Sequence, residues 1–254
     1  MKLYFLGTCA GTEPIEGMRH QSMAIESGGK VYFFDAGESC SRTAHLNGVD
    51  LLNISAVFIS HTHMDHVGGL GNLLWCIRKL HSNTGYTAYV CRKTVFIPVK
   101  DTYDGIMQIL QNSENGYGID FDLDCVEYKE GKIYSDENIT VCAHSNTHLK
   151  SENKPSYSFV IECEGKKIVY SGDMGTLYDL DGILSDGCDV LICETGHHKV
   201  SDVCEYARRK NVKSLYFSHN GREIINYPHE SANAACNIFG ESAVIAHDGM
   251  IVDF

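Results

Sequence analysis

The segment Ser60–Gly69 reads Ser-His-Thr-His-Met-Asp-His-Val-Gly-Gly and places three histidines and one aspartate within six residues. It begins at the end of Ala56–Ser60, a short run of apolar and β-branched residues. It leads into Val67–Leu80, where apolar residues recur three or four positions apart. The first run is typical of a buried strand and the second of a helix. The segment is therefore expected to join a strand to a helix, with its two glycines allowing close packing behind the turn.

The polar side chains of this segment are metal ligands by chemical type. His61 and His63 are two positions apart in an extended stretch, so both can face the same side. Asp65 and His66 lie at the turn into the helix and can face a second position. Imidazole is the commonest protein ligand for zinc-like metals, and carboxylates bind harder ions. The segment therefore predicts a metal site.

Four donors in one loop cannot complete the shells of two metal ions, so further ligands are expected after later strands. After the strand-like run Ile139–Ala143 come His144 and His148, and His148 is favoured because it lies beyond the strand. Asp173 and His219 each follow another such run. Asp173 stands between glycines and has two interpretations, a turn residue or a carboxylate that bridges two metals.

The composition is that of a globular protein with an acidic surface. The chain has 254 residues, 43% of them hydrophobic, and a net charge of −12. This excludes disorder as the main state and argues against a general nucleic-acid-binding surface. The 11 cysteines are odd in number and form no Cys-x-x-Cys pair, so they suggest neither a disulfide framework nor a thiolate zinc site. We therefore expect the protein to lie in a reducing cytoplasm. The sequence also lacks the pattern of a membrane span or of a signal peptide.

The order of the runs predicts an α/β fold, with sheets covered by helices, in a single domain over residues 1–254. A weak internal similarity links Val57–His61 with Leu215–His219, since each is an apolar run that ends in Ser-His. Helices are expected at 67–80, 103–112 and 201–210. Strands are expected at 3–6, 23–26, 31–34, 56–60, 87–91, 94–97, 123–127, 139–143, 157–162, 166–170, 189–193 and 214–217, with two short runs within 243–252.

The chain resembles the metallo-β-lactamase-fold hydrolases, and in particular their ribonuclease Z branch of phosphodiesterases. The run from His61 to His66 is the signature of that superfamily, and the resemblance extends nearly end to end. The further matching motifs are Leu6-Gly7-Thr8, Phe33-Phe34-Asp35-Ala36-Gly37-Glu38, His148, Ser171-Gly172-Asp173, Glu194, Ser218-His219 and Ala246-His247-Asp248-Gly249-Met250.

The resemblance implies an αββα metallo-β-lactamase sandwich, in which two mixed β-sheets flanked by helices carry two divalent metal ions at one edge. Zinc is the expected metal, with Mn or Fe as alternatives. The resemblance implies that one ion is held by His61, His63 and His148. It implies that the other is held by Asp65, His66 and His219, and that Asp173 bridges the two ions.

Two further residues match the family more loosely. His197, which precedes His219 by 22 residues, resembles the histidine that ribonuclease Z places near the leaving group, where an acidic residue orients it. The family usually continues with Ser-Thr, whereas His198 follows here, so the general acid is His197 or His198. Arg222 could bind a substrate phosphate or form an ordinary surface ion pair.

These features predict a binuclear metal-dependent hydrolase, with a phosphodiesterase favoured. A hydroxide between the metals would attack the ester, and Asp65 would orient or deprotonate that water. The alternatives are a tRNA 3′-end-processing ribonuclease, a thioester or lactone hydrolase of the same fold, and a di-iron redox protein. The last class generally has a glutamate where His63 stands, which speaks against it.

The substrate is expected to be small and anionic. Ribonuclease Z carries a basic, Gly-rich arm that clamps tRNA, and the sequence between Leu80 and Ile139 contains no such arm. The basic clusters Arg92-Lys93 and Arg208–Lys210 are interpreted as solvated faces. A small phosphodiester is therefore favoured over RNA, no membrane partner is expected, and a homodimer is left open. The polar segment 150–155 could cover the site or be a simple loop.

Overall fold

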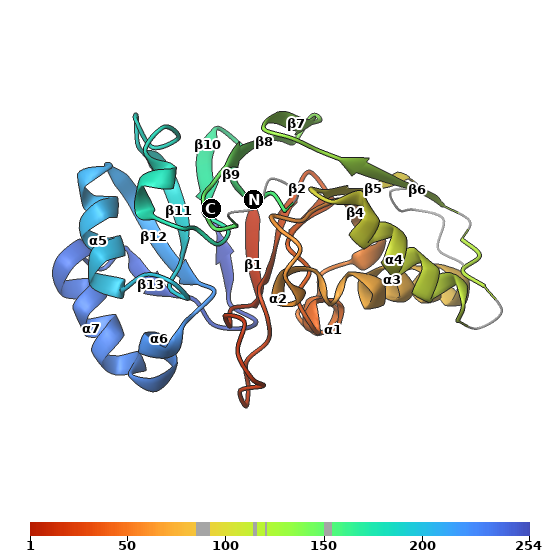
Figure 1. The fold of residues 1–254 in the computed structure, drawn as a ribbon, viewed down its shortest axis with the longest axis horizontal. Helices are drawn as coiled ribbons and strands as arrows, with labels where there is room; N and C mark the ends of the chain where they lie inside the picture. Colours follow the sequence, from red (N-terminus) through yellow and green to blue (C-terminus); the bar gives the residue numbers. More distant parts are fainter. Residues whose placement is uncertain (85–91, 114–115, 120, 150–153) are drawn as a thin grey trace. The chain divides into compact units, whose positions relative to one another are not determined.

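The computed structural model describes residues 1–84, 92–113, 116–119, 121–149 and 154–254. The chain divides into two compact units. The first contains Met1–Gly7, Glu16–Tyr128 and Asp248–Phe254, and the second contains Thr8–Ile15 and Lys129–His247. Each unit has its own sheet and its own helices (Figure 1). The strand expected at 87–91 and residues 150–153 of the polar segment lie outside the described residues. A single domain over 1–254 stays a prediction.

The first unit contains the strands β1 (Lys2–Gly7), β2 (Ser22–Ser27), β3 (Lys30–Phe34), β4 (Ile54–Phe58), β5 (Arg92–Ile97), β6 (Asp122–Glu127) and β14 (Ile251–Asp253). In the described residues they form a seven-stranded sheet ordered β14-β1-β2-β3-β4-β5-β6. Pairing is antiparallel from β14 to β3 and parallel from β3 to β6. β4 is buried along its whole length, as its apolar sequence predicts.

The helices of the first unit are α1 (Cys40–Leu46), η1 (Leu51–Asn53), α2 (Met64–Val67), α3 (Leu70–Thr84) and α4 (Lys100–Gln111). The helix expected over 67–80 begins at Leu70, and it buries Leu70, Leu73 and Ile77 at helical spacing.

Gly68 and Gly69 separate α3 from α2 and allow the backbone crossing behind the histidine segment. A Cβ on Gly69 would lie 2.1 Å from the carbonyl oxygen of Gly37. A Cβ on Gly37 would lie 2.3 Å from the carbonyl oxygen of Asp65. The close packing predicted from the glycines is confirmed.

The second unit contains the strands β7 (Gly131–Ser135), β8 (Ile139–Ser145), β9 (Tyr157–Cys163), β10 (Lys166–Tyr170), β11 (Cys188–Glu194), β12 (Val212–Ser218) and β13 (Ala243–Ile245). In the described residues they form a second seven-stranded sheet ordered β13-β12-β11-β10-β9-β8-β7. Pairing is antiparallel from β7 to β10 and parallel from β10 to β13. The two sheets thus repeat one scheme, three antiparallel pairs followed by three parallel pairs.

The helices of the second unit are η2 (Leu177–Leu180), α5 (Val200–Arg209), α6 (Arg222–Asn226) and α7 (Pro228–Phe239). α5 and α7 pack side by side (Figure 1). α5 buries Val203, Cys204 and Ala207 in the core of this unit. The prediction of two mixed sheets flanked by helices is confirmed.

The described part of the chain has no helix that is both long and apolar enough to cross a membrane. Its ten cysteines are all free of disulfide bonds.

Candidate metal centre

In the first unit the histidine segment leaves the end of β4 and enters α2. His63 is extended, with φ −67° and ψ 149°, and it caps the N-terminus of α2. The ring centroid of His61 lies 4.6 Å from that of His63 and 4.1 Å from that of His66. Nε2 of His66 lies 3.5 Å from a carboxylate oxygen of Asp65. The structure therefore brings these four predicted ligands together.

Asp35, directly after β3, orients this group of ligands. Its fully buried carboxylate accepts hydrogen bonds from the backbone N–H of Ser60 at 2.7 Å and the hydroxyl of Ser60 at 2.8 Å. The same carboxylate contacts Nδ1 of His66 at 2.7 Å, and the hydroxyl of Ser60 lies 3.1 Å from Nδ1 of His61. A partner on Nδ1 fixes the ring, so Nε2 of His61 and of His66 is the nitrogen suited to a metal.

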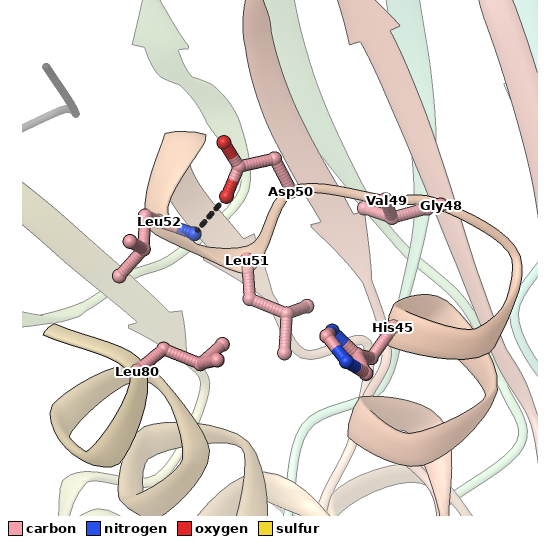
Figure 2. A pocket seen from close by; sticks show the side chains of 7 residues that line it. All are labelled: His45, Gly48, Val49, Asp50, Leu51, Leu52 and Leu80. Atoms are coloured by element: carbon pink, nitrogen blue, oxygen red, sulfur yellow. Dashed lines mark hydrogen bonds between the residues drawn. The ribbon is translucent and has the colours of Figure 1, made fainter. Parts of the chain in front are cut away.

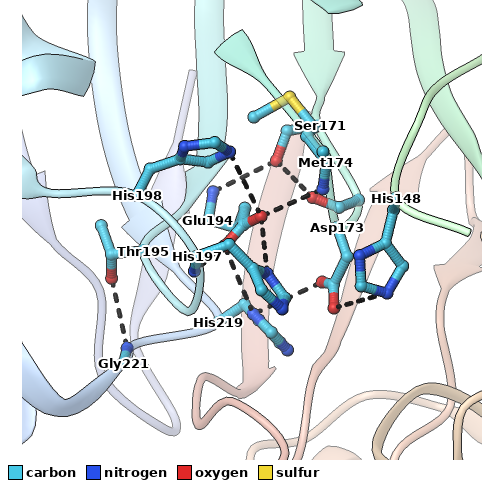
Figure 3. Close-up of polar contacts among 12 residues, drawn as sticks. His148, Ser171, Asp173, Met174, Glu194, Thr195, His197, His198, His219 and Gly221 are labelled. Atoms are coloured by element: carbon cyan, nitrogen blue, oxygen red, sulfur yellow. Dashed lines mark hydrogen bonds and ion pairs between the residues drawn. The ribbon is translucent and has the colours of Figure 1, made fainter.

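In the second unit Asp173 lies between two histidines from different strands. One carboxylate oxygen lies 3.7 Å from Nε2 of His148, and the other lies 3.4 Å from Nδ1 of His219 (Figure 3). Asp173 is 2% exposed. His144 remains on β8, where Nδ1 lies 3.9 Å from the carboxylate of Glu130. The structure thus brings His148, and not His144, to Asp173.

Asp179, in η2, ties together the loops that carry two of these residues. Its carboxylate accepts hydrogen bonds from the N–H of Thr147 at 3.1 Å and from the hydroxyl of Thr147 at 3.0 Å. It also accepts from the N–H groups of Gly175 and Thr176, each at 3.2 Å. Thr147 directly precedes His148, and Gly175 follows Asp173 by two residues, so one carboxylate fixes both loops.

His219 is held in an unusual backbone conformation with φ 52°. Thr195 N–H donates to the carbonyl oxygen of His219 at 3.3 Å, and the N–H of Asn220 donates to Thr8 at 2.6 Å. The imidazole lies against Gly196, where a Cβ would approach Nδ1 of His219 to 2.7 Å. A non-glycine residue in the left-handed region is strained, and it persists where surrounding contacts fix it at a functional site.

Glu194, at the end of β11, holds His197. The buried carboxylate accepts a hydrogen bond from the N–H of His197 at 2.8 Å and contacts Nδ1 of the same residue at 2.9 Å. Nε2 of His198 is farther away, at 3.7 Å from the carboxylate (Figure 3). The Glu194 carboxylate raises the pKa of the His197 imidazole. The closer partner of the acidic residue is therefore His197.

Arg222, at the start of α6, forms an ion pair with Glu13, and the two side chains are 51% and 63% exposed. To bind a substrate phosphate, the Arg222 guanidinium would have to release the Glu13 carboxylate or contact both groups at once. Its role in substrate binding stays a prediction.

The donor sets fit divalent cations. Both units offer imidazole nitrogens and carboxylate oxygens, the ligands of Zn, Mn and Fe. Within the second unit, ligand atoms of Glu194, His197 and His219 lie within 4.8 Å of one another. Asp35 was named only as part of a matching motif and Asp179 not at all, whereas the structure shows that both orient the donors. The available signals were an aspartate directly after a strand and the capping pattern Thr-x-x-Asp at Thr176–Asp179.

Two cavities differ in what lines them. In the first unit a cavity of about 290 Å³ lies between His45, Asp50 and Leu80 (Figure 2). The Asp50 carboxylate accepts from the N–H of Leu52 at 3.0 Å, and none of the predicted ligands lines this cavity. In the second unit a groove of about 500 Å³ is lined in part by His197 and His198.

Comparison with known proteins identifies the family. The family described as Anti-Pycsar protein Apyc1 matches residues 1–220. The ribonuclease Z of Methanocaldococcus jannaschii is 26% identical to this chain, and the alignment covers 86% of this chain and 85% of that protein. The ribonuclease Z of Picrophilus torridus is also 26% identical, over 95% of this chain and 92% of that protein.

Solved structures share the fold. The metallo-β-lactamase fold protein YhfI from Bacillus subtilis superposes with a TM-score of 0.79 at 18% identity, covering 99% of this chain and 98% of that chain. Human tRNase Z, short form (ELAC1), gives a TM-score of 0.73 at 20% identity, covering 100% and 99%. A diphosphatase from the PhnP family gives 0.69 at 16% identity, covering 100% and 97%.

The sheets, the donor sets and these matches agree with the resemblance drawn from the sequence. The chain therefore belongs to the family described as Anti-Pycsar protein Apyc1 and is a metal-dependent hydrolase of the metallo-β-lactamase fold.

Proposed function

We propose that the protein is a phosphodiesterase that uses two divalent cations, with zinc the preferred metal, to hydrolyse a small phosphodiester such as a cyclic nucleotide. The observation that carries the proposal is the position of Asp173, whose two carboxylate oxygens face two different imidazoles at 3.7 and 3.4 Å. A carboxylate that serves two metals needs this arrangement, whereas a turn residue does not.

The assignment of the ligands follows the resemblance stated for the sequence. One ion would be held by His61, His63 and His148, the other by Asp65, His66 and His219, with Asp173 shared. The chemistry that such cations supply is the binding of the anionic ester and the lowering of the pKa of water towards neutrality. Asp65 orients the attacking water and can accept its proton.

His197 is the proposed general acid. Nδ1 faces the Glu194 carboxylate at 2.9 Å, so the proton available to a leaving oxygen is on Nε2. The His197 side chain is 44% exposed, while the Glu194 side chain is 1% exposed. The buried carboxylate therefore orients the ring and stabilises its protonated form, and the exposed ring can reach a substrate.

Two observations support phosphorus as the centre of reaction and a small substrate. The relatives include ribonucleases and a diphosphatase, which by their names cleave bonds to phosphorus. The net charge of −12 disfavours an extended track for RNA phosphates. The cysteine pattern supports the proposal that the enzyme works in a reducing cytoplasm.

A second candidate, tRNA 3′-end processing, is supported by the ribonuclease Z relatives. The decisive comparison is kcat/KM on cyclic mononucleotides and bis-p-nitrophenyl phosphate against cleavage of a 3′-extended tRNA, all at one salt concentration. We expect turnover of the small diesters and little cleavage of the tRNA. Efficient, salt-sensitive tRNA cleavage with poor turnover of the small diesters would overturn the proposal. If the protein hydrolyses only a thioester or a lactone, the proposed metal ligands are unaffected, but the bond that the enzyme cleaves is not a phosphodiester.

A further inference from the structure

Ser158, on β9, lies at the centre of a chain of hydrogen bonds in the second unit. Its hydroxyl donates to the carbonyl oxygen of Ser171 at 2.6 Å and accepts from the side-chain amide of Asn146 at 3.2 Å. The oxygen of the same amide, Oδ1 of Asn146, accepts from the backbone N–H of His148 at 3.2 Å. The chain therefore links the loop that carries His148 to the residue that follows β10.

The register of the sheet explains why Ser158 reaches both of these places. On one side of β9, Ser158 pairs with His144 of β8. On the other side, Phe159 pairs with Tyr170 of β10, so Ser158 faces the residue that follows β10. Because β9 lies between β8 and β10, a side chain at this position can bridge the ends of both neighbouring strands.

Burial makes this chain of hydrogen bonds hard to replace. Ser158 is 1% exposed and Ser171 is fully buried. A buried polar group that loses its partner is left unsatisfied, since water cannot take the partner's place. The hydroxyl of Ser171 extends the chain, because it accepts from the backbone N–H of Glu194 at 3.1 Å. The hydrogen bonds thus hold the ends of four neighbouring strands, from β8 to β11.

One distance in the candidate metal centre depends on the two loops that this chain joins. Nε2 of His148 lies 3.7 Å from a carboxylate oxygen of Asp173, two residues after Ser171. Two ligand atoms bound to one zinc ion lie roughly 3.3 Å apart, because each bond is about 2.0–2.1 Å long. The separation in the structure is therefore close to that of two ligands of one ion, and a shift of either loop would weaken the binding of that ion.

We propose that Ser158 is a positioning residue of the metal centre, which sets the separation of His148 and Asp173. The inference rests on the proposed metal ligands and adds to them a residue whose side chain is not itself a ligand. Asp179 joins the same two loops at exposed residues, whereas Ser158 joins them inside the sheet.

The test compares Ser158→Ala with Ser156→Ala. Ser156 lies two positions earlier and is also buried, at 2%, but its hydroxyl has no hydrogen-bond partner among the described residues. The measurements are zinc affinity by competition with a fluorescent chelator and the absorption spectrum of the cobalt-substituted protein, which reports ligand geometry. We expect Ser158→Ala to weaken zinc binding by about 10-fold or more and to change the cobalt spectrum. Ser156→Ala should match the wild type in both.

Ile161→Val separates positioning from stability. Ile161 is a fully buried residue of the same strand, so the substitution leaves a small cavity in the core and keeps the chain of hydrogen bonds. We expect it to lower the Tm without changing zinc affinity or the cobalt spectrum.

Asn146→Ala removes the neighbouring link of the chain at a partly exposed position, and it carries the test if Ser158→Ala does not fold. We expect it to weaken zinc binding as much as Ser158→Ala does. The double variant should weaken it little further, because both side chains act through one chain of hydrogen bonds.

The possible failures are distinguishable. If the wild type holds no metal, the proposed metal ligands and this inference are both overturned. If the wild type binds zinc and Ser158→Ala matches Ser156→Ala in affinity and cobalt spectrum, the inference alone is overturned and the proposed function stands. If Ile161→Val weakens zinc binding as much as Ser158→Ala does at an equal loss of Tm, the inference is also overturned, since affinity then follows stability.

Discussion

At the scale of single residues, the sequence left two interpretations of Asp173, a bridging metal ligand and a turn residue, and its substitution distinguishes them. As a bridging ligand, Asp173→Ala should lose metal and turnover together while the protein stays folded. As a turn residue, it would cost about 1 kcal/mol of stability and leave the metal in place. Elemental analysis, activity and thermal unfolding of the purified variant decide between them.

Asp181→Ala is the matched control for Asp173. It removes an aspartate of the same unit that pairs with Lys210 at 2.7 Å and with Tyr206 instead of with histidines. We expect its metal content to equal that of the wild type. Equal metal content in Asp173→Ala and the wild type would exclude the bridging role.

His148 and His144 form a natural pair for a second test, because they lie four positions apart and differ in their partners. His148→Ala should reduce metal content and turnover, since Nε2 lies 3.7 Å from Asp173. His144→Ala should change neither, since this ring faces Glu130. The reverse result would mean that the third imidazole of the first metal is His144.

Gly196 predicts an effect through geometry alone. In Gly196→Ala the new Cβ would lie 2.7 Å from Nδ1 of His219, so the imidazole must move. We expect activity to fall by roughly 10- to 100-fold with a smaller loss of stability. Gly182→Ala, where the added Cβ meets nothing within 4 Å, is the control. Wild-type activity in both variants would show that the position of His219 is not critical.

The sequence identified the ligand types at this scale but not what orients them. The spacing of His61 and His63 predicted their common side, because it depends only on the local backbone. The contact of Asp35 with His66 spans 31 positions and exists only after β3 and β4 pair in register. Lys93 was assigned to a solvated face and this was wrong, since it is 2% exposed and donates to the carbonyl oxygens of Leu52 and Ile54 at 2.7 and 3.0 Å.

At the scale of elements, Asp179 couples two loops from different strands. Asp179→Asn exchanges one acceptor oxygen for a donor, which then faces the N–H groups of Thr147 or Gly175. We expect a loss of roughly 1–3 kcal/mol of stability and a metal affinity lower by about 10- to 100-fold. Competition with a fluorescent chelator measures the affinity, and denaturant unfolding measures the stability.

Asp186→Asn, an exposed aspartate of the same unit outside η2, is the control for Asp179. It should leave both quantities unchanged. If Asp179→Asn is less stable but binds metal with wild-type affinity, then Asp179 stabilises the fold without positioning the metal ligands.

The elements that the sequence predicted were those with a clear buried face. β4 and α3 carry continuous or periodic apolar residues and were predicted within a few positions. β7 was missed because it lies at the edge of its sheet and none of its residues is buried, so it has no apolar pattern. α1 and α7 were also missed, although Pro228 at the start of α7 is a typical helix signal.

At the scale of the whole molecule, bound metal should raise the free energy of unfolding. Ions that bind only the folded chain stabilise it by about 4 kcal/mol when they are present at a thousand times their Kd. We therefore expect a chelator to lower the Tm by roughly 10 °C and added zinc or manganese to restore it. Elemental analysis of protein purified without chelator should give two metals per chain. A reproducible value of one or below, with a Tm unaffected by chelator, contradicts the two-metal proposal.

The repeated pairing scheme of the two sheets bears on the weak similarity of Val57–His61 to Leu215–His219. A shared strand-end geometry in the two halves would explain that similarity, and so would chance. In each sheet one strand pairs antiparallel with the strand before it and parallel with the strand after it, and these strands are β3 and β10. The strand that follows β3 is β4 and the strand that follows β10 is β11, so β4 corresponds to β11 and not to β12. The equivalence lies instead at the preceding strand ends, where Asp35 follows β3 and Asp173 comes shortly after β10.

The groove beside His197, which lies between η2 and α5, has a consequence for how this enzyme can be altered. On α5, Asp202, Glu205 and Arg209 share the exposed face, while Val203, Tyr206 and Ala207 on the opposite face are buried. Substitutions on the exposed face leave both the core and the proposed metal ligands untouched. A small library of substitutions at these three positions should therefore change the surface beside His197 without producing unfolded or metal-free variants.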